Sequence, residues 1–171
     1  LMVMRVSKEE LVAVLSQFNP WWRDEVIADL PKWRRAAFRE LHGWLTNPPA
    51  PRAVLISGAR QIGKTTLMLQ AADALLRDGV TPANILYATF DHPILKLAGI
   101  DAVLEAWRER EPKADGPEYL FLDEAQFIRD WGTWVKHQVD FRKDRRIAFT
   151  GSAMPLVEAD QESGVGRWHT I

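Results

Sequence analysis

The stretch from Gly58 to Thr66 reads G-A-R-Q-I-G-K-T-T and has the residue types of a triphosphate site. It follows G-x-x-x-x-G-K-[ST] in full, a pattern in which backbone N–H groups surround phosphate oxygens. Gly58 and Gly63 permit the backbone angles that turn successive N–H groups inward. Lys64 supplies a positive charge for the β- and γ-phosphates, and the Thr65 hydroxyl suits the Mg²⁺ that bridges them. We therefore expect the whole loop to lie against the phosphates: Gly58, Ala59, Arg60, Gln61, Ile62, Gly63, Lys64, Thr65 and Thr66.

A second group of reactive side chains follows the apolar run Tyr119 to Leu122. Asp123 and Glu124 close this run, which is typical of a buried parallel strand that carries acids to its C-terminal edge. We expect Asp123 to hold Mg²⁺ through water or Thr65, and Glu124 to polarise the water that attacks the γ-phosphate. Alone, the pattern also fits a charge pair at a helix N-terminus. Behind a complete phosphate loop, it predicts the second half of an ATPase site.

A phosphate loop needs a strand before it and a helix after it, and the sequence provides both. Ala53 to Ile56 is an apolar strand run, and Leu67 to Arg77 has helical spacing with Gly79 beyond it as the C′ residue. Further strands are predicted at 84–90, at 146–150 and from 167 onward, with helices over 94–110, broken near Gly99, and around 131–139. Strands alternating with helices predict an α/β fold with a parallel sheet.

The N-terminal residues have a different organisation. Ser7 to Glu10 form a capping box that starts a helix ending at Asn19-Pro20, and Pro31 is placed to begin a second helix through about Leu45. Residues 46–51 are rich in proline and predict a stiff linker. We therefore expect residues 1–47 to form a helical appendage and residues 48–171 to form the nucleotide-binding core. One face of the second helix carries a nucleic-acid patch or, more commonly, a solvated charged surface: Lys32, Arg34, Arg35, Arg39 and His42.

Composition sets limits on the class of protein. The chain has 171 residues, of which 47% are hydrophobic, so it is the size of one domain with a sizeable core. Its net charge of -1 gives no global electrostatic case for binding nucleic acid or a membrane. The absence of cysteine excludes disulfides and thiolate metal sites. No apolar run approaches the length of a membrane span, and we expect a cytoplasmic protein without a membrane partner.

Four segments together resemble the AAA+ P-loop ATPases, and more narrowly a prokaryotic group of them. These segments are F-N-P-W-W at 18–22, the phosphate loop at 58–66, L-D-E-x-Q at 122–126 and T-G-S at 150–152. The resemblance covers nearly the whole chain and implies a three-layer core with a parallel sheet in the order 5-1-4-3-2. It also implies that Ser152, or Thr150 beside it, reads the γ-phosphate, and that Asp91 matches an acidic position. Arg167 resembles a segment that often carries an arginine finger.

The resemblance also implies parts that this sequence lacks. Members of the group usually continue into a winged-helix segment and a nuclease-like domain, and here the last predicted strand has barely begun at Ile171. We therefore expect the core to be truncated at its C-terminus. The implied partners are a second copy, through AAA+ type contacts, and DNA or the missing effector domain.

The leading hypothesis for function is Mg²⁺-dependent hydrolysis of ATP, with ATP and ADP as ligands. Glu124 favours hydrolysis, because a protein that only binds nucleotide does not need a carboxylate beside Asp123. The alternative is a nucleotide-gated switch with little turnover, or a DNA-associated regulatory module that rests on the basic face described above. No guanine-specific element is evident, which favours adenine.

Overall fold

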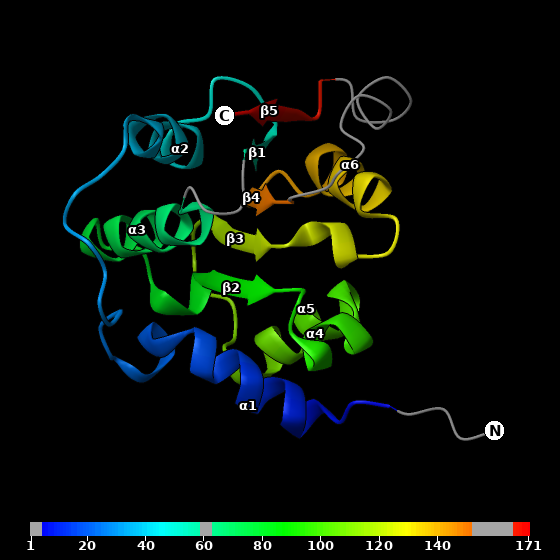
Figure 1. The fold of residues 1–171 in the computed structure, drawn as a ribbon. Coiled ribbons are helices and arrows are strands. Elements are labelled where there is room, and N and C mark those ends of the chain that lie inside the picture. Colours follow the sequence, from blue (N-terminus) through cyan, green and yellow to red (C-terminus); the bar gives the residue numbers. More distant parts are fainter. Residues whose placement is uncertain (1–4, 59–62, 152–165) are drawn as a thin grey trace.

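The computed structural model describes residues 5–58, 63–151 and 166–171, which fold around one parallel sheet (Figure 1). The strands are β1 (Ala53–Ile56), β2 (Ile85–Thr89), β3 (Glu118–Asp123), β4 (Arg145–Thr150) and β5 (Trp168–Thr170). The α-helices are α1 (Lys8–Phe18), α2 (Ala36–Thr46), α3 (Lys64–Arg77), α4 (Pro93–Ala98), α5 (Ile100–Arg110) and α6 (Trp131–Phe141). Short 3-10 helices are η1 (Pro20–Arg23), η3 (Pro82–Asn84) and η4 (Ala125–Phe127). None of these helices is long and apolar enough to cross a membrane.

The strands lie in the order β2-β3-β4-β1-β5, and each neighbouring pair is parallel. This confirms the predicted order 5-1-4-3-2. Figure 1 shows α2 and α3 on one face of the sheet and α4, α5 and α6 on the other. Right-handed crossovers require this arrangement, because the chain moves outward from β1 to β2 and then back through β3 to β4. With both faces covered, β1, β2 and β3 are buried along almost their whole length, as their apolar runs predict.

The prediction that a helix begins at Pro31 is wrong, because α2 begins at Ala36. The residues from Pro31 to Arg34 are not helical, and Arg35 at the N-cap is extended, with ψ of 160°. The side-chain amide of Gln70, on α3, donates hydrogen bonds to the carbonyl oxygens of Pro31 and Trp33, at 3.0 and 2.7 Å. These two hydrogen bonds hold residues 31–33 against α3 in a non-helical conformation.

The N-terminal segment packs on the edge strand β2. The Ser7 side chain accepts a hydrogen bond from the Glu10 N–H, and the Glu10 side chain accepts one from the Ser7 N–H, which confirms the predicted capping box. The indole N–H groups of Trp21 and Trp22 both donate to the Ile85 carbonyl, at 3.0 and 2.9 Å. Buried side chains of α1 and η1 belong to the same hydrophobic cluster as the sheet. This packing protects an edge strand that would otherwise present unpaired backbone groups.

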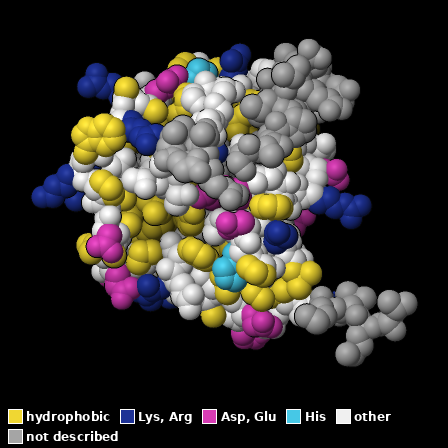
Figure 2. Space-filling view, viewed as in Figure 1, with side chains coloured by type: hydrophobic (Ala, Val, Ile, Leu, Met, Phe, Trp, Pro, Cys, Tyr) yellow, Lys and Arg dark blue, Asp and Glu magenta, His cyan; other side chains and the backbone are white. Residues whose placement is uncertain are grey.

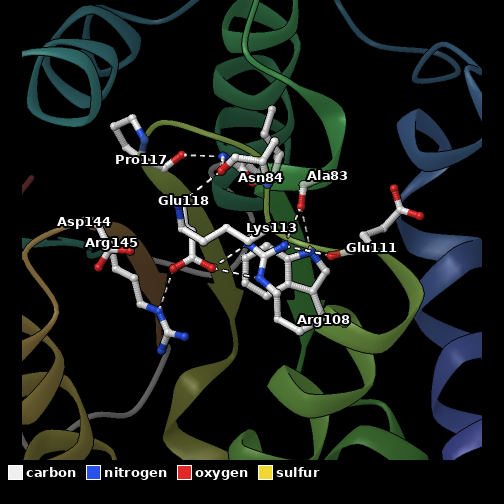
Figure 3. Close-up of polar contacts among 12 residues, drawn as sticks. Ala83, Asn84, Arg108, Glu111, Lys113, Pro117, Glu118, Asp144 and Arg145 are labelled. Carbon is white, nitrogen blue, oxygen red and sulfur yellow. Dashed lines mark hydrogen bonds and ion pairs between the residues drawn. The ribbon is translucent and has the colours of Figure 1, made fainter.

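The buried carboxylate of Glu118 fixes the N-terminal end of β3 (Figure 3). Glu118 is only 1% exposed and accepts hydrogen bonds from Arg108, on α5, and from Arg145, which starts β4. Arg142, at the end of α6, lies 3.5 Å from the same carboxylate. Three guanidinium groups, from α5, from the end of α6 and from the start of β4, therefore surround one buried negative charge. This cluster is structural, since it lies at the sheet edge opposite the C-terminal ends of the strands.

We expect Glu118→Ala to lower the free energy of unfolding by about 3–5 kcal/mol, because it leaves the side chains of Arg108 and Arg145, which are 21% and 9% exposed, without their anion. Glu105→Ala is the matched control, since Glu105 pairs with Lys8 on the surface and its side chain is 71% exposed. The control should have a much smaller effect. Urea unfolding of both variants measures the difference, and equal losses would contradict the role given to Glu118.

Candidate functional site

The C-terminal ends of the strands meet at one edge of the sheet, where helix α3 also begins. Beyond the end of β1 at Ile56, Gly58 has φ of 116° and Gly63 has φ of 74°, angles that favour glycine. Helix α3 starts at Lys64, so its N–H groups and the positive end of its dipole face this edge. The other predicted residues of the loop, and the predicted sensor, lie outside the described residues: Ala59, Arg60, Gln61, Ile62 and Ser152.

Lys64 is directed toward the loop. Its side chain is buried, and Nζ donates a hydrogen bond to the Gly58 carbonyl at 3.1 Å. A buried ammonium group needs such an acceptor. Thr65 and Thr66 follow on the first turn of α3. The Lys64 ammonium group, which we predict to bind phosphates, is therefore held at the start of the loop by the Gly58 carbonyl.

Asp123 is the centre of the site. It is buried at the end of β3 and accepts hydrogen bonds from three hydroxyl groups. Thr65 Oγ1 and Tyr87 Oη both donate to Oδ2, each at 2.6 Å. Thr150 Oγ1 donates to Oδ1. The structure thus brings together Thr65 and Asp123, the two residues predicted to hold Mg²⁺, and adds donors from β2 and β4.

Tyr87 is absent from the residues predicted from sequence. Burial raises the pKa of its phenol above the ordinary value, and the negative charge of Asp123 acts in the same direction. The phenol therefore stays protonated and serves as a donor. A signal was present in the sequence, because a tyrosine on a buried strand usually finds a partner for its hydroxyl. Its partner became evident only from the pairing of β2 with β3.

Glu124 leaves the line of β3 in a left-handed backbone conformation, with φ of 53°. Its N–H donates to Thr150 Oγ1 at 3.0 Å, and its carboxylate accepts from Gln126 Nε2 at 2.6 Å. A positive φ costs a residue other than glycine about 1–3 kcal/mol, so the surrounding contacts must hold this turn. Thr150 therefore binds both acids of the predicted pair, the side chain of Asp123 and the backbone of Glu124.

A cleft of about 580 Å³ opens at this edge of the sheet. Its lining is mainly hydroxyl-bearing, acidic and aromatic: Phe18, Thr65, Tyr87, Thr89, Asp91, His92, Asp123 and Glu124. Asp91, the acidic position implied by the resemblance, accepts a hydrogen bond from Thr89 Oγ1 at 2.6 Å. Figure 2 shows acidic side chains near the centre of this face, close to a histidine and a basic side chain, and further acidic and basic side chains around its periphery. An acidic lining of this kind attracts cations.

The structure does not bring Arg167 to this cleft. The Arg167 carbonyl accepts a hydrogen bond from the Ala53 N–H at the start of β1, which is the opposite edge of the sheet. Its guanidinium pairs with Asp140, on α6, at 3.1 and 3.2 Å. This hydrogen bonding holds the pKa of the Asp140 carboxyl below its usual value. A role as arginine finger would require a neighbouring chain and stays a prediction.

Sequence comparison identifies the family. The sequence model of the AAA domain family matches residues 50–171. The chain belongs to the AAA domain family. An uncharacterized protein from Haemophilus influenzae is 32% identical over 110 residues, which cover 62% of this AAA domain chain and 26% of that protein. The chain therefore spans about a quarter of that relative's length.

Two solved structures share the fold. The Aeropyrum pernix ORC1 protein in complex with DNA matches with a TM-score of 0.51 and 15% identity, over 84% of this chain and 47% of that chain. AMPPCP-bound DnaA from Aquifex aeolicus matches with a TM-score of 0.51 and 16% identity, over 88% of this chain and 49% of that chain. At this identity the likeness shows the fold, which is that of an AAA+ P-loop ATPase. Family and fold together support a nucleotide-binding, ATPase-like role for the AAA domain.

We expect Arg167→Ala to leave the affinity of the isolated chain for ATP unchanged, because Arg167 lies at the edge opposite the cleft and pairs with Asp140. Calorimetric titration with ATP measures this. Lys64→Ala, at the loop itself, is the control that should weaken binding. A clear loss of affinity in Arg167→Ala would contradict the separation between Arg167 and the nucleotide.

Proposed function

We propose that this chain binds ATP at the phosphate loop and hydrolyses it with the help of Mg²⁺. The observation that carries the proposal is the 2.6 Å hydrogen bond between Thr65 Oγ1 and Asp123 Oδ2. It joins the first turn after the loop to the acidic end of β3. In P-loop NTPases these two positions, the loop Ser/Thr and an acid at the C-terminal end of another strand of the same sheet, hold the metal. Membership of the AAA domain family supports a nucleotide as the ligand.

The side chains present fit Mg²⁺. Hydroxyl and carboxylate oxygens are the ligands this ion prefers, and in nucleotide sites it is bound by one or two such groups together with phosphates and water. Among the described residues, no group of three or more His, Asp or Glu side chains could hold a metal by itself. When bound, Mg²⁺ supplies positive charge that offsets the charge of the phosphates. Thr65 and Asp123 are the residues that we assign to it.

The remaining predicted residues have separable roles in this proposal. The N–H groups of the loop, from Gly58 to Thr66, surround the phosphates, and Lys64 adds charge at the β- and γ-phosphates. Glu124 polarises the attacking water, and Ser152 contacts the γ-phosphate. Thr150 holds the two acids in their relative positions through its hydrogen bonds to both. Catalysis then comes mainly from positioning and charge stabilisation, as in other phosphoryl transfers.

One observation favours the second candidate, a nucleotide-gated switch with little turnover. The Glu124 carboxylate accepts a hydrogen bond from Gln126 at 2.6 Å. A carboxylate engaged by an amide is a weaker partner for water than one that faces the γ-phosphate directly. A switch of this kind would bind nucleotide tightly and respond to it through conformation.

The proposal does not include DNA binding. DNA binding and self-association stay predictions from the sequence. DNA is present in the ORC1 structure, but that likeness shows the fold alone. In the basic segment of this chain, the Arg34 guanidinium lies 4.1 Å over the ring of Phe38. His42 lies 3.1 Å from Asp78. Lys32, Arg34 and Arg35 precede α2, so they do not form a face of that helix as predicted, and all three side chains are exposed.

We expect Glu124→Gln to keep its affinity for ATP and to lose about 10²–10⁴-fold in turnover, because the amide preserves shape but cannot polarise water as a carboxylate does. Steady-state phosphate release and calorimetry with ATP and Mg²⁺ measure the two quantities. Lys64→Ala is the control for binding and should lose affinity itself.

The same experiment separates the candidates. A parent chain that binds ATP but turns over as slowly as Glu124→Gln supports the switch. Equal and substantial turnover in parent and Glu124→Gln would remove Glu124 from the mechanism. Unchanged affinity in Lys64→Ala would overturn the assignment of the phosphate loop itself.

A further inference from the structure

We propose that Tyr87, held in place by Asn19, is a positioning residue that sets the affinity of the nucleotide site for Mg²⁺ through Asp123. This inference rests on the proposed function and assigns a role to the F-N-P-W-W segment at 18–22, which that function leaves unexplained. It concerns two residues that come from the edge strand and the N-terminal segment, outside both nucleotide motifs.

The phenol of Tyr87 fixes the acid that the metal site depends on. Tyr87 Oη and Thr65 Oγ1 donate to the same oxygen of Asp123, each at 2.6 Å. Thr65 is itself assigned to the metal, so its hydroxyl oxygen must serve two partners. Tyr87 is not assigned to the metal in the proposed site. It is therefore the donor that can hold Asp123 Oδ2 in one orientation whether or not the ion is bound.

Asn19 in turn fixes Tyr87. Its side chain is fully buried at the open edge of β2. Nδ2 donates to the carbonyl of Tyr87 at 2.9 Å and to that of Leu15 at 2.7 Å, and Oδ1 accepts from the Tyr87 N–H at 2.7 Å. The amide thus makes the pair of hydrogen bonds that a neighbouring strand would make. The Phe18 ring packs against the Tyr87 ring, with centroids 6.0 Å apart.

These contacts form a continuous path from the N-terminal segment to the metal site. Asn19 holds the backbone of Tyr87, Tyr87 holds the carboxylate of Asp123, and Asp123 binds Thr65. Removing a group that hydrogen-bonds to a metal ligand and orients it commonly lowers metal affinity by about 10–100-fold. A purely structural tyrosine would instead change stability, or weaken nucleotide binding equally with and without the ion.

The test is the gain in nucleotide affinity that Mg²⁺ produces. A non-hydrolysable ATP analogue is titrated by calorimetry in Mg²⁺ and in EDTA, with the parent chain and Tyr87→Phe. We expect Tyr87→Phe to bind the analogue as tightly as the parent does in EDTA. The factor by which Mg²⁺ increases this affinity should be about tenfold smaller in Tyr87→Phe than in the parent. Tyr119→Phe is the matched control, because Tyr119 is the other tyrosine of the chain, is buried in β3, and lies at the far end of that strand from Asp123. It should behave as the parent in both conditions.

Asn19→Ala tests the other link in the path. We expect it to reduce the Mg²⁺ gain in the parent background and to have no further effect in the Tyr87→Phe background, because it acts through Tyr87. Equal effects in both backgrounds would overturn the part assigned to Asn19. Thermal unfolding of each variant shows whether the folded state is intact under the titration conditions.

The outcomes separate this inference from the proposed function. An unchanged Mg²⁺ gain in Tyr87→Phe, or an equal loss of affinity in Mg²⁺ and EDTA, overturns the inference and leaves the ATP site in place. A parent chain that binds no ATP analogue overturns the proposed function instead.

Discussion

The organisation of the site depends on how the buried carboxylate of Asp123 is satisfied. A buried charge is costly unless hydrogen bonds compensate for it, and here three hydroxyl groups do so. They come from different elements: Thr65 from α3, Tyr87 from β2 and Thr150 from β4. The requirement to satisfy one carboxylate therefore fixes three elements at the C-terminal edge of the sheet. The geometry proposed for nucleotide and metal follows from that constraint.

The two ends of the sheet have contrasting electrostatics. At the C-terminal edge, neutral hydroxyl groups surround Asp123, so its charge remains available to a cation. At the N-terminal edge, three guanidinium groups surround Glu118 and neutralise it within the fold. A buried acid matched by fixed cations is neutralised within the fold, and its removal leaves those cations unpaired, whereas an acid matched by hydroxyl groups can still bind an ion. This difference is the physical reason for assigning function to one edge and a structural role to the other.

The sequence was sufficient for the features that depend on local patterns. The strand order and the ends of α1 follow from apolar runs, capping residues and the resemblance, and the structure confirms them. The features that depend on tertiary contacts could not be predicted in this way. The Gln70 side chain binds the carbonyls of Pro31 and Trp33, which would accept helical hydrogen bonds if a helix began at Pro31. The partner of the Tyr87 hydroxyl depends on the pairing of β2 with β3, which no local pattern determines. The ion pair of Arg167 with Asp140 likewise depends on where β5 meets α6.

The most direct test of the central claim compares ATP binding by the parent chain and Asp123→Asn, each titrated by calorimetry in Mg²⁺ and in EDTA. The account predicts that Mg²⁺ tightens binding to the parent and that Asp123→Asn loses this gain while keeping the affinity measured in EDTA. An equal gain in both proteins would contradict the assignment of Asp123 to the metal site.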